Sequence, residues 1–263
     1  MQNARITSKY LLLGAGHRLQ LSGKWSQEIG LYVSANNFAN PFISNYEKRE
    51  EHGVGGRNNW QYTTEKGGAK LIWTSGFEWQ TGRSVQRNYD NMGGSPGPQQ
   101  TSEDISARQG SVFSQLEAVL PGQLTFAGGL SYSLLGYRHE SYFPGDYADL
   151  RKTFEGAVMP RLSVNKVFSS NWSVTGSVSR GFSPPTLQEV RPSAGGFRRD
   201  LEAETGFNKE LTFRYVGHGF SAEVTGYSFG LNETIVRRTD EQGAEYFANA
   251  GKTRQNGMEW KLE

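Results

Sequence analysis

The stretch from Trp172 to Glu189 reads WSVTGSVSRGFSPPTLQE, and its first half alternates strictly. Even-numbered residues from Trp172 to Val178 are apolar or glycine, and the odd-numbered ones are serine or threonine. A period of two predicts an extended strand with one apolar and one polar face. Pro184 and Pro185 end this strand, because neither has a backbone N–H to donate. A strand with one face for lipid and one for water indicates a transmembrane β-barrel.

The composition agrees with such a sheet. Among 263 residues the apolar fraction is only 35%, yet aromatic residues reach 13% and glycines number 33. Disordered chains are poor in aromatic residues, whereas a sheet with a single apolar face needs few apolar residues in total. The net charge of +2 and the absence of a basic stripe give no indication of a nucleic-acid partner.

The sequence lacks cysteine, a long apolar run and a secretion signal. It has no cysteine, which excludes disulfides and cysteine-based metal or nucleophilic sites. No apolar run approaches the ~18 residues of a transmembrane helix, which a barrel does not require. The N-terminal MQNARITSKY lacks a secretion signal. Because an outer-membrane protein needs that signal, we expect the chain to be part of a longer protein.

Alternating strands recur along the chain in pairs joined by tight polar turns. The predicted hairpins join residues 10–21 with 27–35, 55–64 with 69–80, 111–120 with 124–136, 156–167 with the strand from Trp172, and 207–216 with 220–235. A last segment covers residues 246–262, so about eleven meandering strands are expected. The row from Leu124 to Leu134 has the clearest alternation, and we expect it to lie bare on the outer wall.

Long polar connections separate the hairpins. Residues 36–52, 81–107, 137–152 and 183–206 are predicted to be irregular loops. Short turns at one end and long loops at the other are typical of outer-membrane barrels, whereas soluble β-sandwiches have similar loops at both ends. By parity Arg180 falls on the lipid side, so we expect it at the rim or at a bulge.

Three motifs follow one another in the second half of the chain. The segment SRGFSPPTLQE, the segment DLEAE with Asn208 and Glu210, and the segment NAGK resemble, in order and spacing, segments of TonB-dependent outer-membrane receptors. The first and third motifs contribute these residues: Arg180, Gly181, Phe182, Pro184, Pro185, Thr186, Glu189, Asn249, Gly251, Gly257 and Glu259. The form of the first motif looks most similar to receptors for ferric siderophores or ferric citrate.

The resemblance implies a 22-stranded barrel in the bacterial outer membrane, with an N-terminal plug and a TonB box. Neither is recognisable here, so residues 1–263 are interpreted as part of a single all-β barrel domain, truncated at both ends. The implied partners are a ferric chelate, the protein's own plug, the TonB complex, and outer-membrane lipid including lipopolysaccharide.

Arginines and tyrosines of the long connections are the candidate ligand contacts, because a ferric chelate is bulky, often anionic and rich in flat groups. The candidates are Arg83, Arg87, Tyr89, Tyr142, Tyr147, Arg191, Arg198 and Arg199. Solvated charges, lipopolysaccharide contacts and an aromatic belt are the alternative roles. The four histidines lack ligand spacing, and His139 and Glu140, near Asp146, have no oriented nucleophile. We therefore expect no catalytic residue, no metal site and no cofactor.

Active import of an iron chelate is the leading hypothesis. The rivals are a receptor for a non-iron ligand such as cobalamin or a glycan, a passive porin-like or adhesin-like barrel, an outer-membrane barrel enzyme, and a soluble β protein. An enzyme would need a triad or an acidic dyad at the rim, and no such spacing is found.

Overall fold

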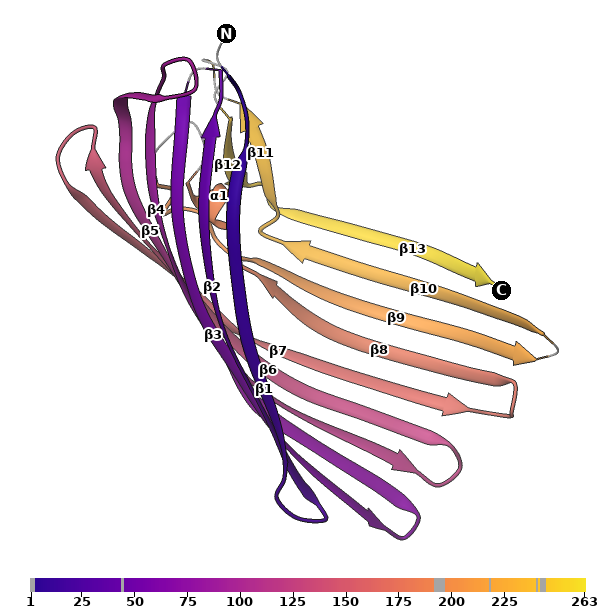
Figure 1. Ribbon diagram of the computed structural model, residues 1–263. Coiled ribbons are helices and arrows are strands. Elements are labelled where there is room, and N and C mark those ends of the chain that lie inside the picture. The colour runs from indigo at the N-terminus through magenta and orange to yellow at the C-terminus, as the bar shows by residue number, and fades with distance from the viewer. Residues whose placement is uncertain (1–2, 44, 192–196, 218, 240, 242–244) are drawn as a thin grey trace.

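The chain is a long antiparallel meander in the computed structural model, which describes residues 3–43, 45–191, 197–217, 219–239, 241 and 245–263 (Figure 1). Each strand pairs with the next, and β13 pairs with β10, so that eleven strands form one sheet. The strands are β1 (Thr7–Gln20), β2 (Trp25–Pro41), β3 (Asn45–Lys66), β4 (Ala69–Asn91), β5 (Pro96–Leu120), β6 (Leu124–Phe143), β7 (Ala148–Val167), β8 (Trp172–Ser183), β9 (Glu204–Gly217), β10 (Phe220–Asn232) and β13 (Lys252–Leu262). The predicted all-β meander is confirmed.

Two strands stand apart from the large sheet. β11 (Ile235–Thr239) and β12 (Glu245–Asn249) pair only with each other. The sequence predicted one strand over residues 220–235 and another over residues 246–262. β10 and β13 confirm most of each, but the end of the first and the start of the second are wrong, because residues 235 and 246–249 belong to β11 and β12. Glu233 and Gly251 have positive φ angles of 56° and 103°, and these left-handed residues break the chain between β10 and β11 and between β12 and β13.

The central strands are far longer than a bilayer requires. β3, β4 and β5 have 22, 23 and 25 residues, whereas a tilted strand crosses a membrane with ~9–11. Gly67 and Gly68 both have positive φ, which suits the two-residue turn between β3 and β4. The other ends of these strands run on together as paired strand beyond the apolar rows, through polar positions such as Glu47, Asn88 and Thr101. Figure 1 shows these long strands side by side.

This extension corrects three of the predicted loops. Most of residues 36–52, 81–107 and 137–152 form paired strand, with turns such as the one between Asn91 and Pro96. Alternation reveals a strand only where one face meets an apolar phase. Both faces of these extensions carry polar residues, so the pattern that marks a strand disappears although the backbone pairing continues.

The apolar residues of neighbouring strands are in register. One row runs through Trp73, Leu116, Gly128, Leu162 and Val178 on five successive strands, β4 to β8. The row from Leu124 to Leu134 lies bare as expected, with Leu130 56% and Leu134 45% exposed. We call this apolar side the outer face, and the opposite side the inner face.

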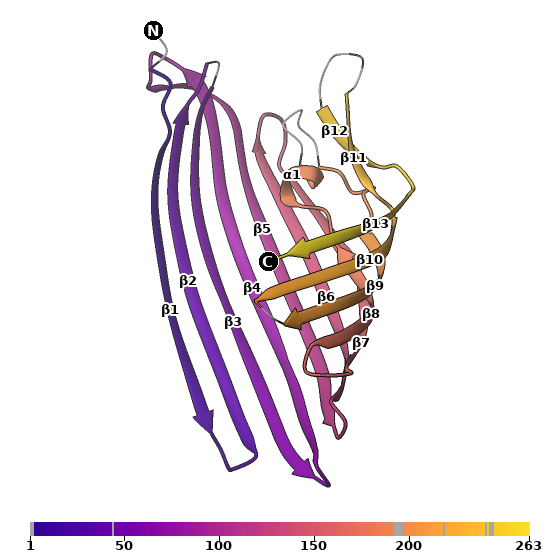
Figure 2. The ribbon, with the colours of Figure 1, turned by 90° about the vertical axis from the view of Figure 1, so that its right-hand side faces the viewer.

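A small core lies on the inner face, where a short helix sits within the curve of the sheet (Figure 2). It consists of Leu135, Phe154 and Val190, with Tyr137, Phe182, Phe197 and Ala203 packed against them. Val190 belongs to the four-residue helix α1 (Leu187–Val190), which occupies part of the expected 183–206 loop. Among the described residues, no helix is long and apolar enough to cross a bilayer.

Candidate functional site

The connection between β8 and β9 begins with a capping box. The Thr186 backbone N–H donates to Glu189 Oε2 at 2.6 Å, and the Glu189 N–H donates to Thr186 Oγ1 at 3.4 Å. This reciprocal pair satisfies backbone groups at the start of α1. Tyr137 also donates from its hydroxyl to the Pro185 carbonyl at 3.1 Å. The segment PPTLQE therefore turns the chain inward and fixes α1 against the wall.

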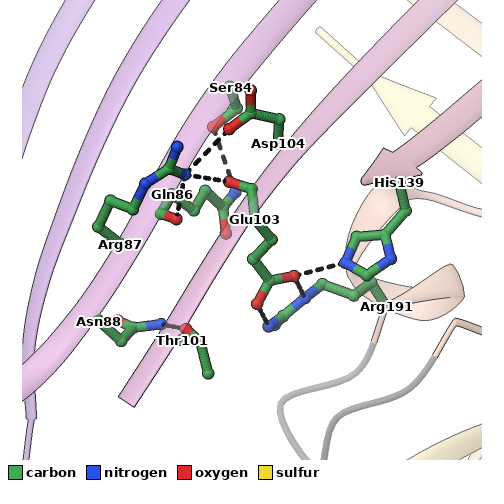
Figure 3. Close-up of polar contacts among 9 residues, drawn as sticks. All are labelled: Ser84, Gln86, Arg87, Asn88, Thr101, Glu103, Asp104, His139 and Arg191. Carbon is green, nitrogen blue, oxygen red and sulfur yellow. Dashed lines mark hydrogen bonds and ion pairs between the residues drawn. The ribbon is translucent and has the colours of Figure 1, made fainter. Parts of the chain in front are cut away.

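Arg191 follows α1 and reaches the inner face of β5 (Figure 3). Its Nε donates to Glu103 Oε2 at 2.5 Å, and its Nη2 donates to Glu103 Oε1. The His139 Nε2 lies 2.6 Å from the same Oε2, and the Glu103 side chain is only 5% exposed. A bidentate guanidinium–carboxylate pair is among the stronger charge-assisted contacts.

Glu103 lies far beyond the ~9–11 residues that cross the membrane from the Leu120 end of β5. Burial acts to raise the pKa of its carboxyl, but hydrogen bonds from His139 and Arg191 outweigh burial and lower that pKa to about 2. The carboxyl is therefore ionised at neutral pH. The ring of His139 stacks on Phe197 with centroids 5.5 Å apart, and its Nδ1 is buried without a hydrogen-bond partner among the described residues.

A second charged cluster lies on the outer face of the same strands. Asp104 follows Glu103 directly, and consecutive strand residues point to opposite faces. Asp104 accepts from Arg83 Nη2 at 2.5 Å and from Arg87 Nη1 at 2.9 Å, and its side chain is 4% exposed. Figure 3 shows the contact with Arg87. These two arginines therefore share one carboxylate on the outside of the wall.

The same outer cluster continues onto β6 and β7. The Tyr142 ring lies 5.8 Å from the Arg87 guanidinium and 5.5 Å from the Tyr147 ring. Tyr147 donates to Glu140 at 3.0 Å. Tyr89 is paired with Tyr46 further up the extension. All of these predicted contacts lie on the outer face.

The remaining predicted contacts lie in the connection between α1 and β9. Arg198 binds Asp200 through two contacts of 2.9 and 2.5 Å, and its guanidinium lies 5.4 Å from the Tyr246 ring centre. Arg199 is exposed. The eight candidates thus separate into Arg83, Arg87, Tyr89, Tyr142 and Tyr147 outside, and Arg191, Arg198 and Arg199 in the connection. A single ligand cannot contact both groups.

Of the residues important for this arrangement, Glu103 and Asp104 carried no signal in the sequence, and His139 was considered with the wrong neighbour. The sequence grouped His139 with Glu140, but the strand places these two on opposite faces. His139 meets Glu103 from the neighbouring strand instead. Only the register of β5 and β6, which includes a shift between Ser102 and Glu103, brings them together.

A polar chain lines the inner face nearer the turns. Tyr32 donates to Gln80 at 3.0 Å, and Gln80 donates to Gln109 at 2.9 Å. They border a hollow of about 440 Å³ that Gly14 and Gly30 leave open. Such a wall can bind polar surfaces, and it presents no oriented nucleophile or acid–base pair among the described side chains.

The family comparison agrees with this geometry. The family described as TonB dependent receptor-like, beta-barrel matches residues 2–263. The chain belongs to the TonB-dependent receptors. These receptors are outer-membrane β-barrel transporters and not enzymes, so the expected fold, location and absence of catalysis are confirmed.

Solved TonB-dependent receptors share the fold. The ferric citrate transporter FecA in its unliganded form is 14% identical with a TM-score of 0.79, over 98% of this chain and 39% of that one. The siderophore receptor PiuA from Acinetobacter baumannii is 10% identical with a TM-score of 0.74, over 99% and 45%. The copper transporter OprC is 14% identical with a TM-score of 0.77, over 97% and 43%. The chain spans less than half of each of these receptors.

Sequence similarity is higher over a shorter stretch. An "Iron-regulated outer membrane virulence protein" from Vibrio cholerae serotype O1 is 40% identical over 75 residues, which is 25% of this chain and 12% of that protein.

The second and third TonB-dependent receptor motifs are joined by one side chain. Asn249 Nδ2 donates to the carbonyls of Glu202 and Glu233 at 3.1 and 2.7 Å, and its Oδ1 accepts from the Glu202 N–H at 2.9 Å. Glu204 accepts from the Ile235 N–H at 2.7 Å. These contacts tie the start of β9 to the β11–β12 ribbon.

Gly257 of the third motif has a steric role. A Cβ built on it would lie 2.5 Å from Tyr227 Cζ on β10, so only glycine lets the ring cover the strand. By contrast, a Cβ on Gly181 would meet no atom within 4 Å. Glu259 is exposed on the inner face of β13, and Phe182 packs on the inner core.

Proposed function

We propose that this segment of a TonB-dependent receptor, part of a single barrel domain over residues 1–263, serves active uptake of a ferric siderophore or similar iron chelate. The observation that carries the proposal is the 40% identity over 75 residues with the iron-regulated Vibrio cholerae protein. The likeness to the ferric citrate transporter and to PiuA supports it at the level of the fold.

The proposed mechanism makes and breaks no covalent bond. The outer parts of the receptor capture the chelate, and TonB then drives a rearrangement of the plug. Among the predicted contacts we assign ligand capture to Arg198 and Arg199, because Phe197, directly before them, packs on the inner core and the Arg198 N–H donates to the Val190 carbonyl. Guanidinium groups bind anionic oxygen ligands through charge-assisted hydrogen bonds. Arg191 acts instead as a positioning residue through Glu103.

Copper uptake is the second candidate, because the copper transporter OprC shares the fold with a TM-score of 0.77. Cobalamin and glycan uptake have no comparable observation in their favour. A passive porin-like role is disfavoured by membership of a family whose transport is energised through TonB.

Growth of a gene-deletion strain on defined metal sources tests the proposal. Under iron limitation we expect loss of growth on one class of ferric chelate, restored by the complete gene. A complete gene carrying Arg198→Ala and Arg199→Ala should restore uptake of radiolabelled iron poorly, whereas Arg214→Ala, on the inner face of β9, should restore it fully. Normal growth on every ferric chelate, with reduced copper accumulation, would support the copper alternative.

A further inference from the structure

His139 joins the wall to the connection after α1 through two different contacts. At the edge of its ring, Nε2 lies 2.6 Å from Glu103 Oε2 on the neighbouring strand β5 (Figure 3). The flat face of the same ring stacks on Phe197, with the ring centroids 5.5 Å apart and the planes only 5° from parallel. One imidazole on β6 therefore bridges β5 and the connection.

The other ring nitrogen of His139 gives no reason of stability for a histidine at this position. The side chain is only 9% exposed, yet Nδ1 has no hydrogen-bond partner in the part of the chain that the structure describes. A buried polar atom without a partner costs stability, so packing alone would favour an apolar ring. Glu103 does not require the imidazole either, because Arg191 already binds both of its oxygens. A role other than stability therefore accounts for the histidine.

Phe197 directly precedes the two arginines that the proposed function assigns to ligand capture. The Arg198 backbone N–H donates to the Val190 carbonyl at 2.7 Å, and two contacts with Asp200 orient its guanidinium. The Arg198 side chain is 27% exposed, and Arg199 is exposed. A displacement of the Phe197 ring would therefore move both arginines, although neither of them contacts His139.

The chain after these arginines has anchors of its own. Leu201 is 1% exposed, and Glu202 accepts from Lys152 Nζ on β7 at 3.1 Å. The two arginines thus lie between a segment fixed by Leu201 and Glu202 and a segment fixed by Phe197. A segment that is already ordered loses less conformational freedom when a ligand binds, and this preorganisation raises affinity.

We propose that His139 is a positioning residue for ligand capture. Its imidazole, oriented by Glu103, holds Phe197 by stacking, and thereby keeps Arg198 and Arg199 ready to bind. This role rests on the proposed function, because the arginines are taken to capture the ferric chelate. His139 itself does not touch the ligand. Without its ring the arginines would be present but less well ordered, so affinity would fall while the wall stays folded.

The test uses His139→Gln in the complete receptor, purified in detergent. The glutamine amide can still donate to Glu103, so the variant removes the ring and keeps a hydrogen bond to the carboxylate. The probes are ferric citrate, a ferric tris-hydroxamate and a ferric tris-catecholate, and binding is followed by tryptophan fluorescence. Affinity for the probe that the parent receptor binds should fall about three- to tenfold, the effect of losing one aromatic pair. The control, His52→Gln on the outer face of β3, should bind like the parent.

Hydrogen exchange separates positioning from a general loosening of the connection. In His139→Gln the Arg198 amide should exchange several times faster than in the parent. The Arg191 amide, which donates to the Leu187 carbonyl at 2.8 Å, should stay protected, because the contact of Arg191 with the wall remains. If the parent receptor binds none of the three probes, the proposed iron function fails, and exchange at the Arg198 amide alone decides the role of His139.

A second variant separates the stacked ring from the hydrogen bond. His139→Phe keeps a flat ring beside Phe197 but cannot donate to Glu103, so it should bind more tightly than His139→Gln and less tightly than the parent. The proposal is overturned if His139→Gln binds and exchanges like the parent, if its two amides accelerate equally, or if His139→Phe matches either of the other two proteins.

Discussion

Arg191 and Glu103 form a bidentate ion pair although 88 positions separate them along the chain. The pair joins the end of α1 to the inner face of β5. The connection that carries Arg198 and Arg199 starts from this point, so this carboxylate of the wall is one of the groups that fix its position.

Removing that carboxylate's charge should loosen α1. Glu103→Gln leaves Arg191 without its counter-charge and weakens the contact by about 2 kcal/mol, within the range for hydrogen bonds to charged groups. Hydrogen exchange at the Val190 and Arg191 amides should accelerate more than about tenfold. Glu117→Gln, also on the inner face of β5, is the control and should leave both amides unchanged. Unchanged exchange in Glu103→Gln would mean that packing alone holds α1.

The same contact should depend on pH. The folded pKa of Glu103, about 2, lies below the usual 4.5, so its contribution to stability is complete above about pH 4.5. That contribution is lost as the pH falls toward 2. Protection of the α1 amides, corrected for intrinsic exchange, should be constant from pH 7 to 5 and decline below pH 4. In Glu103→Gln this decline should be absent. If the protection of the α1 amides were already lost at pH 5.5, a group other than Glu103 would control it.

Asn249→Ala should release the start of β9 from the ribbon. The variant loses three hydrogen bonds to backbone groups, and each contributes about 1 kcal/mol. Limited proteolysis should then cut near Leu201 several times faster than in the parent protein. Gln255→Ala, on the exposed inner face of β13, serves as the control. Equal cleavage rates in the three proteins would contradict a tethering role for Asn249.

Gly257→Ala should destabilise the barrel by about 1–3 kcal/mol, the usual cost of overpacking, because Tyr227 occupies the space of the new methyl group. Urea unfolding in lipid vesicles measures the difference. Gly226→Ala, on the strand opposite, meets no atom within 4 Å and should be nearly neutral. Combining Gly257→Ala with Tyr227→Ala should relieve the clash, and failure of this rescue would point to a backbone cause.

The sequence allowed the apolar half of each strand to be predicted, because lipid on one side and water on the other impose a period of two. The β8 strand from Trp172 and the row from Leu124 to Leu134 follow from that pattern alone. The extensions of β3 to β7 did not follow, since water on both sides removes the pattern while backbone pairing continues.

The candidate site was predicted only in part for the same reason. Because residues 81–107 were interpreted as a loop, the sequence could not predict on which face of the sheet Arg83 and Arg87 lie. Had β4 been continued past Trp79, parity would have placed both arginines outside with the tryptophan. The meeting of Glu103 with His139 and Arg191 depends on strand register and on the return of α1 across the wall, and neither is encoded in local spacing.

The sheet and the connection it encloses differ in mechanical terms. The eleven strands of the wall are joined by ladders of backbone hydrogen bonds. Many of these bonds must break together before the wall can bend. The connection after β8 is fastened by a few side chains, chiefly Arg191 on Glu103 and Asn249 on Glu202. A pulling force applied inside the barrel would therefore detach the connection first and leave the wall as a stiff, stationary frame.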